Sequence, residues 1–398
     1  MTGADSRWFK ILLVTLSFLS TFFIWGVLFT FTVYSETLSE AFSVSFTQAS
    51  GLFSVTLLTF FTSLGVGGLV LTRVPIRRLL IVMSLLSGVA ILALQVAISF
   101  PVLVAIYIAF GVSFGVLFVA ILSLVPQWFD RWGSLALGIT VSGNGVGALV
   151  MPFVWRTGIT SVGIRQTFLF VGAVLVAVHA TTGLILRAPE CEENQGAEEE
   201  PTTIGWLRKL IAHPRFPFAF AGLGLSWAWY YVLSGHLVTI LTRADIDSAV
   251  ATGAFGIIGG VSIISRVLSG MSADYIGSRK VFVATLCLAI IGSSVLLYRG
   301  NMMAVYLAVT LFGIGLGGIA TLTTLVLLDS YGTENATAVV GIFNLAAGVA
   351  GFVAPSIPTI VFGGVEDYTP TILTMIAMTT LGGMLFWYGT GTDRYQRA

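Results

Sequence analysis

The sequence predicts an all-α integral membrane protein, in which twelve transmembrane helices form two pseudo-symmetric six-helix bundles. Three observations predict this fold class. Only 9% of the 398 residues are charged and 56% are hydrophobic, whereas soluble domains carry about 25% charged residues. Twelve apolar stretches each reach the roughly 20 residues that a helix needs to cross a hydrocarbon core of about 30 Å. The second half of the chain also repeats motifs of the first half.

The twelve spans follow one another with short polar segments between them. The first stretch lacks a small-residue cleavage site, so we expect a permanent span and not a cleaved signal peptide. The spans are expected at residues 10–34, 46–71, 79–98, 101–125, 133–157, 165–187, 215–242, 248–273, 280–298, 302–328, 335–362 and 368–390.

The longest polar interval, residues 188–214, carries six glutamates around Pro189 and Pro201. Such a run buries no apolar surface, so we expect a solvated cytoplasmic linker. It separates an N-terminal six-helix bundle, residues 1–187, from a C-terminal one, residues 215–398. By this placement, 14 of the 19 lysines and arginines fall on one side of the membrane and 4 on the other. This bias predicts a multi-pass protein of the cell membrane with both termini in the cytoplasm.

The two halves share motifs at a nearly constant offset. Residues 110–115 in the fourth span match residues 312–317 in the tenth at an offset of 202. Gly145 and Pro152 of the fifth span match Gly348 and Pro355 of the eleventh at an offset of 203. Two parallel halves of six spans are the layout of carriers that rock around a central site.

Composition excludes several other classes of function. A net charge of +1 without a basic run gives nucleic acid nothing to bind. Two cysteines and three histidines without a carboxylate cluster indicate no disulfide framework and no metal site, and we expect no cofactor. We expect no enzyme, because the spans contain no nucleophile with an adjacent base, and no ATP drive, because no Walker-type loop is present.

A charged loop follows the eighth span. Gly270, Asp274, Gly277, Arg279 and Lys280 resemble the cytoplasmic loop signature of the major facilitator superfamily in its second-half copy. The resemblance implies a gate, in which Asp274, Arg279 and Lys280 hold that face shut. The alternative is simple anchoring of positive charge on the cytoplasmic side. The first-half copy is degraded, since Thr72 and Pro75 stand where the signature has an aspartate and a glycine.

A second signature enters the fifth span. Residues 128–147, with the aromatic pair Trp128 and Phe129, the basic Arg131 and glycines at helical spacing, resemble the fifth-helix signature of the monocarboxylate porter family in a prokaryotic-type member. Arg131 is a further gating candidate. Gly143 and Gly147 lie four residues apart on one helix face, where a neighbouring helix can approach closely.

Arg266 lies in the eighth span, eight residues before Asp274, and therefore about 12 Å inside the helix end. All 18 acidic residues fall in loops or at span ends, so no intramembrane carboxylate neutralises it. A buried arginine costs at least about 2.5 to 3.5 kcal/mol on insertion scales. We expect the counter-ion to be a substrate carboxylate, which guanidinium binds through two parallel hydrogen bonds. Snorkelling to the interface is the alternative. The family resemblance implies the same role, because its members carry an arginine at this place.

Two departures from the family concern the proton. Animal members carry an aspartate one turn before the arginine, where this chain has Ser262, and a lysine in the first helix, where it has Phe29. The family's lysine and aspartate relay therefore cannot be transferred. His236 in the seventh span is the candidate for proton coupling, with a satisfied interfacial histidine as the alternative. His179 in the sixth span is given no role.

The remaining binding candidates are polar or apolar groups within spans. Asn144 and Asn344 lie in the middle of the fifth and eleventh spans, and Thr324 belongs to a polar stripe in the tenth. Trp25, Leu28 and Phe29 are candidates for the apolar wall of the site, with Ser262 beside Arg266. The alternatives are interhelical hydrogen bonds for the amides, bonds to its own helix for the threonine, and ordinary packing for the aromatic groups.

Together these features predict a secondary active transporter of small monocarboxylates such as lactate and pyruvate, proton-coupled and working by alternating access. Its expected partners are the monocarboxylate anion, the proton and the lipid bilayer, and we expect a monomer. An organic anion exchanger of the oxalate and formate type is an alternative, although residues 335–362 hold no second cation. A sensor that keeps the carrier fold without transport is another.

Overall fold

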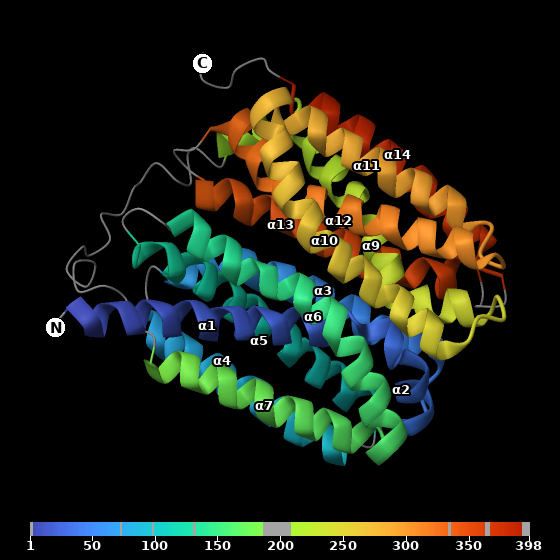
Figure 1. The fold of residues 1–398 in the computed structure, drawn as a ribbon, viewed down its shortest axis with the longest axis horizontal. Helices are drawn as coiled ribbons and strands as arrows, with labels where there is room; N and C mark the ends of the chain where they lie inside the picture. The colour runs from blue at the N-terminus through green and yellow to red at the C-terminus, as the bar shows by residue number, and fades with distance from the viewer. Residues whose placement is uncertain are drawn as a thin grey trace.

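The computed structural model describes residues 3–71, 74–97, 99–129, 133–185, 208–332, 336–362 and 367–391. Across these ranges the regular structure is helical, and twelve helices are long and apolar enough to span a membrane, which confirms the predicted fold class. Figure 1 shows them as a bundle of long, inclined helices. They are α1 (Gly3–Leu28), α3 (Phe46–Leu71), α4 (Ile76–Val96), α5 (Phe100–Gln127), α6 (Gly133–Val162), α7 (Ile164–Ile185), α9 (Phe216–Thr242), α10 (Ser248–Ile276), α11 (Ser278–Leu296), α12 (Met302–Tyr331), α13 (Ala336–Val353) and α14 (Thr369–Gly389).

One predicted span ends earlier than expected, and another reaches its expected end through irregular helix. The first was expected to reach residue 34, but α1 ends at Leu28 and is followed by the 3₁₀ turn η1 (Phe31–Val33) and the short helix α2 (Ser35–Ala41). The eleventh was expected to reach residue 362, but α13 ends at Val353 and the chain continues as η2 (Ala354–Ser356) and the π turn η3 (Ile357–Val361). Pro355 and Pro358 lack an N–H group, so a regular α-helix cannot continue through them.

The helices form two groups, α1 to α7 and α9 to α14, which lie side by side (Figure 1). The groups meet where α3 packs on α13 and where α6 packs on α10. We call the end of the bundle where α1 begins and α14 ends the terminal face, and the opposite end, with η1, α2 and η2, the far face. Both chain ends point to the terminal side in Figure 1.

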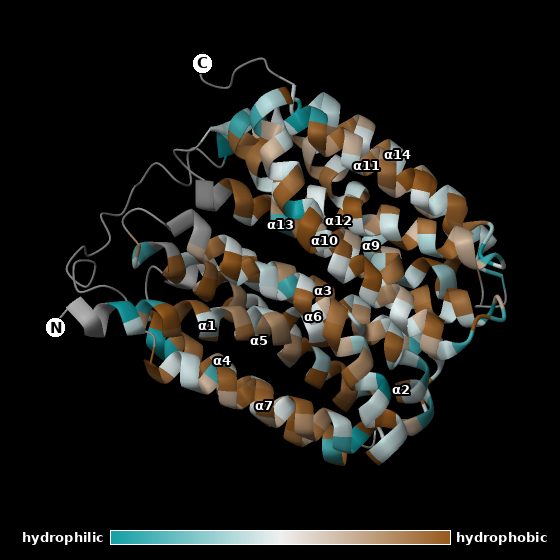
Figure 2. Cartoon of the chain, in the orientation of Figure 1, coloured by the Kyte–Doolittle hydropathy of each residue, from teal (hydrophilic) through white to brown (hydrophobic). Residues whose placement is uncertain are grey.

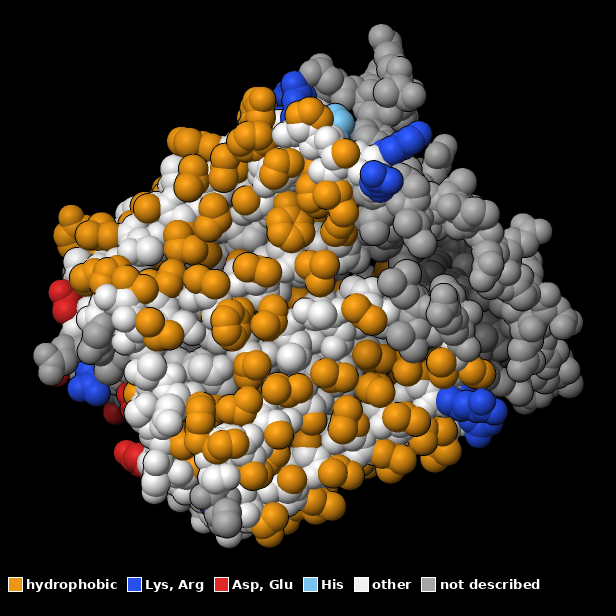
Figure 3. Space-filling view, turned by 180° about the vertical axis from the view of Figure 1, so that it is seen from behind, with side chains coloured by type: hydrophobic (Ala, Val, Ile, Leu, Met, Phe, Trp, Pro, Cys, Tyr) orange, Lys and Arg blue, Asp and Glu red, His pale blue; other side chains and the backbone are white. Residues whose placement is uncertain are grey.

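Apolar side chains cover the flank of the bundle. Residues such as Leu85, Phe170, Ile264 and Met384 are exposed along the helices. Hydrophilic residues concentrate at the two ends in Figure 2, and in Figure 3 the charged side chains lie at the ends while hydrophobic side chains cover the flank between them. This distribution fits a hydrocarbon environment around the flank and water at both faces.

The internal repeat appears as equivalent helix contacts. A Cβ added to Gly115 of α5 would lie 2.3 Å from the Phe60 carbonyl oxygen of α3, and one added to Gly317 of α12 would lie 2.5 Å from the Ser262 carbonyl oxygen of α10. These two glycines are related by the offset of 202. The repeated glycines therefore serve the same purpose in both halves, which is close approach of helix backbones.

At the far face, an arginine side chain ties two segments together in each helix group, and we call each such contact a staple. The Arg165 guanidinium donates to the carbonyl oxygens of Leu94 and Gln95, which ties α7 to the end of α4. In the other group Arg299 pairs with Asp367 at 3.2 Å, and Arg165 and Asp367 are themselves related by the offset of 202. The Thr369 N–H donates to Asp367 and holds the pKa of that carboxyl below its usual range, with the Arg299 charge acting in the same direction. The equivalent positions 165 and 367 thus hold this face in both halves, with an arginine that bonds to carbonyl oxygens in one and an aspartate that pairs with Arg299 in the other.

One prediction concerns the contact between α1 and α6. A Cβ at Gly147 would lie 2.3 Å from the Phe22 carbonyl oxygen, whereas a Cβ at Gly138 on the same helix would meet nothing within 4 Å. Gly147→Ala is therefore expected to destabilise the fold by about 1–3 kcal/mol through overpacking, and Gly138→Ala to leave it unchanged or slightly more stable. Thermal unfolding in detergent measures both variants. Equal unfolding temperatures for the two would contradict the close packing of α1 on α6.

Candidate functional site

Four helices form the buried centre of the bundle. In α9, α5, α1 and α12, 72%, 67%, 56% and 56% of the apolar 18-residue segment of the span is buried inside the protein. In the other spans this share is 50% or less. In chain order these are the seventh, fourth, first and tenth spans, so each half contributes two equivalent helices. Side chains on these helices, and on α3, α6 and α10 packed against them, are placed to bind a ligand between the halves.

Arg266 lies near the middle of the membrane span of α10. Its Nε is buried and has no hydrogen-bond partner, and no acidic group pairs with it among the described residues. The titratable group that interacts with its charge is Tyr230 of α9. Leaving a charge in a membrane span without a partner is costly, and the role of Arg266 as an anion anchor stays a prediction.

Aromatic rings from both halves form one continuous group, which we call the aromatic cluster, and it includes Tyr230, the group that interacts with the Arg266 charge. Phe29 stacks on Trp25 with ring centres 4.1 Å apart and on Tyr230 at 5.5 Å. The Trp25 Nε1–H donates to the Tyr230 hydroxyl at 3.2 Å, which joins α1 to α9. The cluster comprises Trp25, Phe29, Phe60, Phe61, Phe118, Trp227, Tyr230 and Tyr231.

Asn144 lies where α6 meets both α1 and α10. One turn before it, the Thr140 carbonyl oxygen accepts from Thr21 of α1. One turn after it, Ala148 packs on Gly259 of α10. The Asn144 side chain is 2% exposed, and its Oδ1 has no hydrogen-bond partner. It is thus a second buried polar group without a partner, on a helix that contacts the helix of Arg266.

Three other predicted binding residues are engaged elsewhere or lie apart from the aromatic cluster. The Ser262 hydroxyl donates to Gly259 of its own helix at 2.7 Å, and its backbone lies against Gly317 of α12. The Asn344 amide donates to the Val340 carbonyl oxygen of its own helix at 2.8 Å. Thr324 is exposed. In this conformation none of the three presents a buried, unpaired polar group to Arg266.

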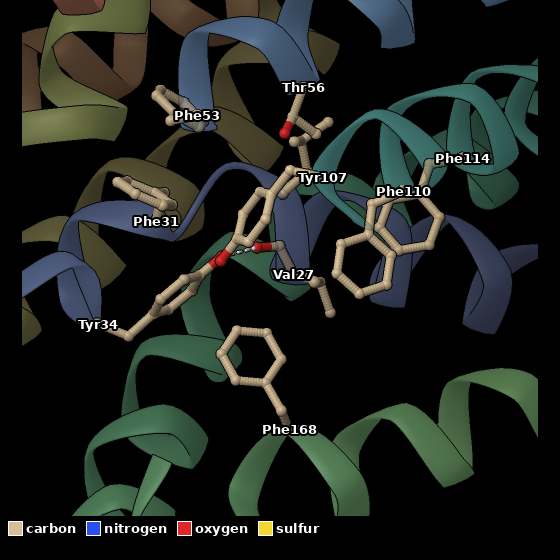
Figure 4. Close-up of a pocket in the computed structure, with 10 residues that line it drawn as sticks. Val27, Phe31, Tyr34, Phe53, Thr56, Tyr107, Phe110, Phe114 and Phe168 are labelled. Carbon is tan, nitrogen blue, oxygen red and sulfur yellow. Dashed lines mark hydrogen bonds between the residues drawn. The ribbon is translucent and has the colours of Figure 1, made fainter. Parts of the chain in front are cut away.

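Leu28 faces away from the aromatic cluster. It lines a cavity of about 10 Å³ within the first helix group, together with Val27, Phe31, Tyr34, Tyr107 and Phe168 (Figure 4). The Tyr34 hydroxyl donates there to the Val27 carbonyl oxygen at 3.0 Å, and the Tyr107 hydroxyl has no partner. Such a volume accommodates about one water molecule. The cavity is therefore too small for a carboxylic acid, and Leu28 belongs to its wall.

His236 lies at the end of the bundle where the sequence places it, with its ring nitrogens satisfied, but it is enclosed by protein and not exposed at the interface. It is fully buried at the far face. Its Nε2 lies 2.7 Å from the Pro355 carbonyl oxygen and its Nδ1 lies 3.3 Å from the Tyr368 hydroxyl. The Phe46 ring of the first helix group packs against it at 5.6 Å. Both ring nitrogens are satisfied, and the surrounding side chains, not interfacial water, provide its environment.

The two helix groups also meet through polar contacts at the far face. The Val238 N–H donates to the Thr32 hydroxyl at 2.9 Å. The Ser54 hydroxyl of α3 lies 2.9 Å from the Ser356 hydroxyl of η2. With the ring contact between Phe46 and His236, these form what we call the far-face seal. At Gly138 of α6, toward the terminal face, an added Cβ would meet nothing within 4 Å.

The predicted gating residues do not act as a unit in this conformation. Arg279 packs over the Trp387 ring at 3.9 Å and donates to the Thr390 hydroxyl at 3.0 Å, so it ties α11 to α14 within one helix group. Asp274 and Lys280 are exposed. Arg131 and the first-half position Thr72 lie outside the described residues. The gating role therefore stays a prediction.

Sequence reasoning missed six members of the aromatic cluster: Phe60, Phe61, Phe118, Trp227, Tyr230 and Tyr231. One available signal was the density of aromatic groups in α9, where four of five consecutive residues from Trp227 onward are Trp or Tyr. The other signal was the burial expected of the seventh span, because it carries these tryptophans and tyrosines. Neither signal identifies the partners of these rings on other helices.

Comparisons with known proteins identify the family. The family model described as the Major Facilitator Superfamily matches residues 13–355. An MFS-type transporter of Bacillus subtilis strain 168, YcxA, is 25% identical over 276 residues, which cover 65% of this chain and 64% of that protein. YhjX of Escherichia coli K12, another MFS-type transporter, is 22% identical over 86% of this chain and 85% of its own length. Both are described as uncharacterized.

Among solved structures, the nucleoside transporter NupG superimposes with a TM-score of 0.76 at 15% identity, over 95% of this chain and 98% of that one. This likeness concerns the fold. The match of the family model covers most of the chain, from α1 to α13, including the contacts of α3 with α13 and of α6 with α10. The chain therefore belongs to the Major Facilitator Superfamily, and its described part carries twelve helices that are long and apolar enough to span a membrane.

Proposed function

We propose that the protein is a secondary active transporter of monocarboxylates, in which Arg266 binds the substrate carboxylate. The observation that carries the proposal is Arg266 on α10, a partly buried residue whose buried Nε has no hydrogen-bond partner and whose charge interacts with Tyr230 of the aromatic cluster. A carboxylate matches its charge and offers two acceptors for the guanidinium fork. Because the described residues supply no acidic partner, one anionic group of the substrate is sufficient to neutralise it.

The proposed cycle is alternating access. The N-terminal half, residues 1–187, and the C-terminal half, residues 215–398, rock about the contacts of α3 with α13 and of α6 with α10. In the present conformation the far-face seal closes one side. We propose that the terminal face is cytoplasmic, that the protein resides in the cell membrane and that it acts as a monomer. Opening of the far-face seal then admits substrate from outside.

The direct test is uptake of labelled lactate and pyruvate by proteoliposomes that contain the full chain, with an inward proton gradient and with empty liposomes as the control for diffusion of the free acid. Saturable uptake that unlabelled monocarboxylates inhibit and uncharged amides do not is the expected result. Uptake inhibited equally by the amides would contradict a carboxylate anchor. Inhibition confined to dicarboxylates would instead favour an organic anion exchanger.

Proton coupling is a separate part of the proposal, with His236 as the proton carrier. His236→Gln is expected to retain exchange of labelled for unlabelled substrate, because exchange needs no net proton movement. It should lose accumulation driven by the proton gradient. Tyr368→Phe is the matched control, since it removes the hydroxyl next to His236 at 3.3 Å and keeps the imidazole. Accumulation as in the unmodified protein would show that His236 is not the carrier and that the proton travels with the substrate acid.

A further inference from the structure

We infer, on the basis of the proposed function, that the preferred substrate is a monocarboxylate whose carbon end is a planar aromatic ring, not a three-carbon hydroxy acid. The inference rests on what surrounds Arg266. The aromatic cluster presents ring faces from α1, α3, α5 and α9. A guanidinium beside stacked rings complements a molecule that carries a carboxylate at one end and a π-system at the other.

The rings are arranged as a stack with a perpendicular wall. The Tyr230, Phe29 and Trp25 rings lie nearly parallel, with interplanar angles of 25° and 24° between neighbours. Phe60 stands edge-on to Phe29 at 88° and to Trp25 at 79°. Offset stacking and edge-to-face contact are the two geometries that aromatic pairs prefer. A planar ring placed against this cluster can therefore make both kinds of contact.

The polar atoms of the stack are already used within it. The Trp25 indole N–H donates to the Tyr230 hydroxyl, so the indole offers a ligand its face and not its donor. A short hydroxy acid offers no flat apolar surface to the ring faces, and a hydroxyl group placed directly against them is desolvated at a cost. The stack thus selects for flat apolar surface. The Asn144 amide remains available to orient a polar substituent.

Some rings of the cluster still have open surface. Trp25 is 8% exposed and Phe61 and Phe118 are 7% exposed, whereas Phe29 and Phe60 are fully buried. Trp227 is half-buried. The cluster is therefore buried in this conformation except at Trp227 of α9, and Trp25, Phe61 and Phe118 are its next least buried rings. A substrate ring would contact Trp227 and these least buried rings while its carboxylate reaches Arg266.

The test compares benzoate with cyclohexanecarboxylate, which has the same number of carbons and the same carboxylate but no π-system, and with lactate. Affinities of the full-length protein in nanodiscs are measured by calorimetry. We expect benzoate to bind about threefold to tenfold more tightly than cyclohexanecarboxylate, which is the range that aromatic pair energies give, and more tightly still than lactate. Equal affinities for benzoate and cyclohexanecarboxylate would overturn the inference.

Variants test whether the rings of the aromatic cluster cause the preference for benzoate over cyclohexanecarboxylate. Phe118→Leu removes one of the least buried rings and is expected to reduce the preference for benzoate over cyclohexanecarboxylate to less than twofold. Trp25→Phe keeps a ring and is expected to preserve the preference. Phe170→Leu, on the lipid-facing side of α7, is the control for loss of an aromatic group. A preference that Phe118→Leu and Trp25→Leu both leave intact would also overturn the inference.

Failure of the inference and failure of the proposed function give different results. If all three carboxylates bind and benzamide does not, the carboxylate anchor stands whether or not the ring is preferred. If benzamide binds as tightly as benzoate, the ring is recognised without the charge, and both the anchor and the inference built on it are wrong.

Discussion

Replacing Arg266 with glutamine is expected to abolish monocarboxylate uptake, with substrate affinity reduced by about 30-fold to several thousand-fold. This range corresponds to the 2–5 kcal/mol that is lost when one partner of a buried, hydrogen-bonded charge pair is truncated. The substrate carboxylate would then enter a buried site without a counter-charge, beside the aromatic cluster. Calorimetric binding and proteoliposome uptake at equal insertion measure the effect.

Arg266→Gln is expected to affect the stability of the fold differently from substrate binding. Arg266 has no hydrogen bond to its buried Nε and no acidic partner among the described residues. Removing a charge that is buried without compensation relieves its desolvation cost. Thermal unfolding of Arg266→Gln without substrate is therefore expected at the same temperature as for the unmodified protein or at a higher one. A large fall in unfolding temperature would indicate that Arg266 holds the fold together and is not reserved for a ligand.

Two further arginine variants control this prediction. Arg266→Lys keeps the charge and loses the planar fork, so affinity is expected to fall by less than in Arg266→Gln. Arg299→Gln breaks the far-face staple with Asp367 at 3.2 Å and is expected to leave substrate affinity unchanged. If Arg299→Gln lowered affinity as much as Arg266→Gln, loss of positive charge in general, and not a specific anchor, would explain the result.

The sequence predicts the spans well because crossing a membrane depends on local composition. Hydropathy and length place eleven of the spans near their observed positions without knowledge of any tertiary contact. The repeated glycines of α5 and α12 are also predictable, since a missing side chain at a fixed offset signals close helix approach in both halves. Arg266 is identified by comparing the positions of the charged residues, because the sequence shows a cation within a span and no acidic residue within any span.

The aromatic cluster is not predictable in the same way, because it requires knowledge of which helix faces meet. Leu28 and Phe29 are adjacent in the chain but lie about 100° apart around a helix. Phe29 stacks on Tyr230, more than 200 residues away, while Leu28 lines the small cavity within its own helix group. An apolar helix has no polar face, so its sequence does not show which of these two side chains points toward the other helix group. His236 is similar, because its burial depends on Phe46 and Pro355 from other segments.

Joining the two halves at the far face is expected to stop transport. The Ser54 and Ser356 hydroxyl oxygens lie 2.9 Å apart, one on α3 and the other on η2. Cysteines at these two positions, in a chain whose native Cys191 and Cys287 are replaced, can reach the disulfide distance of about 2.05 Å with a small shift. Oxidation is expected to reduce uptake to below about a tenth of its reduced value, since alternating access requires this contact to open.

A cross-link within one helix group is the matched control. Ser20 and Thr182 lie 3.2 Å apart through their hydroxyl oxygens, and they join α1 to α7 in the first group. Cysteines there are expected to form a disulfide and leave transport unchanged, because the groups are proposed to move as units. A reductant should restore uptake in the far-face variant. Continued transport by protein fully cross-linked at Ser54 and Ser356 would mean that substrate crosses without opening the far-face seal, and the rocking of the two halves would have to be rejected for this chain.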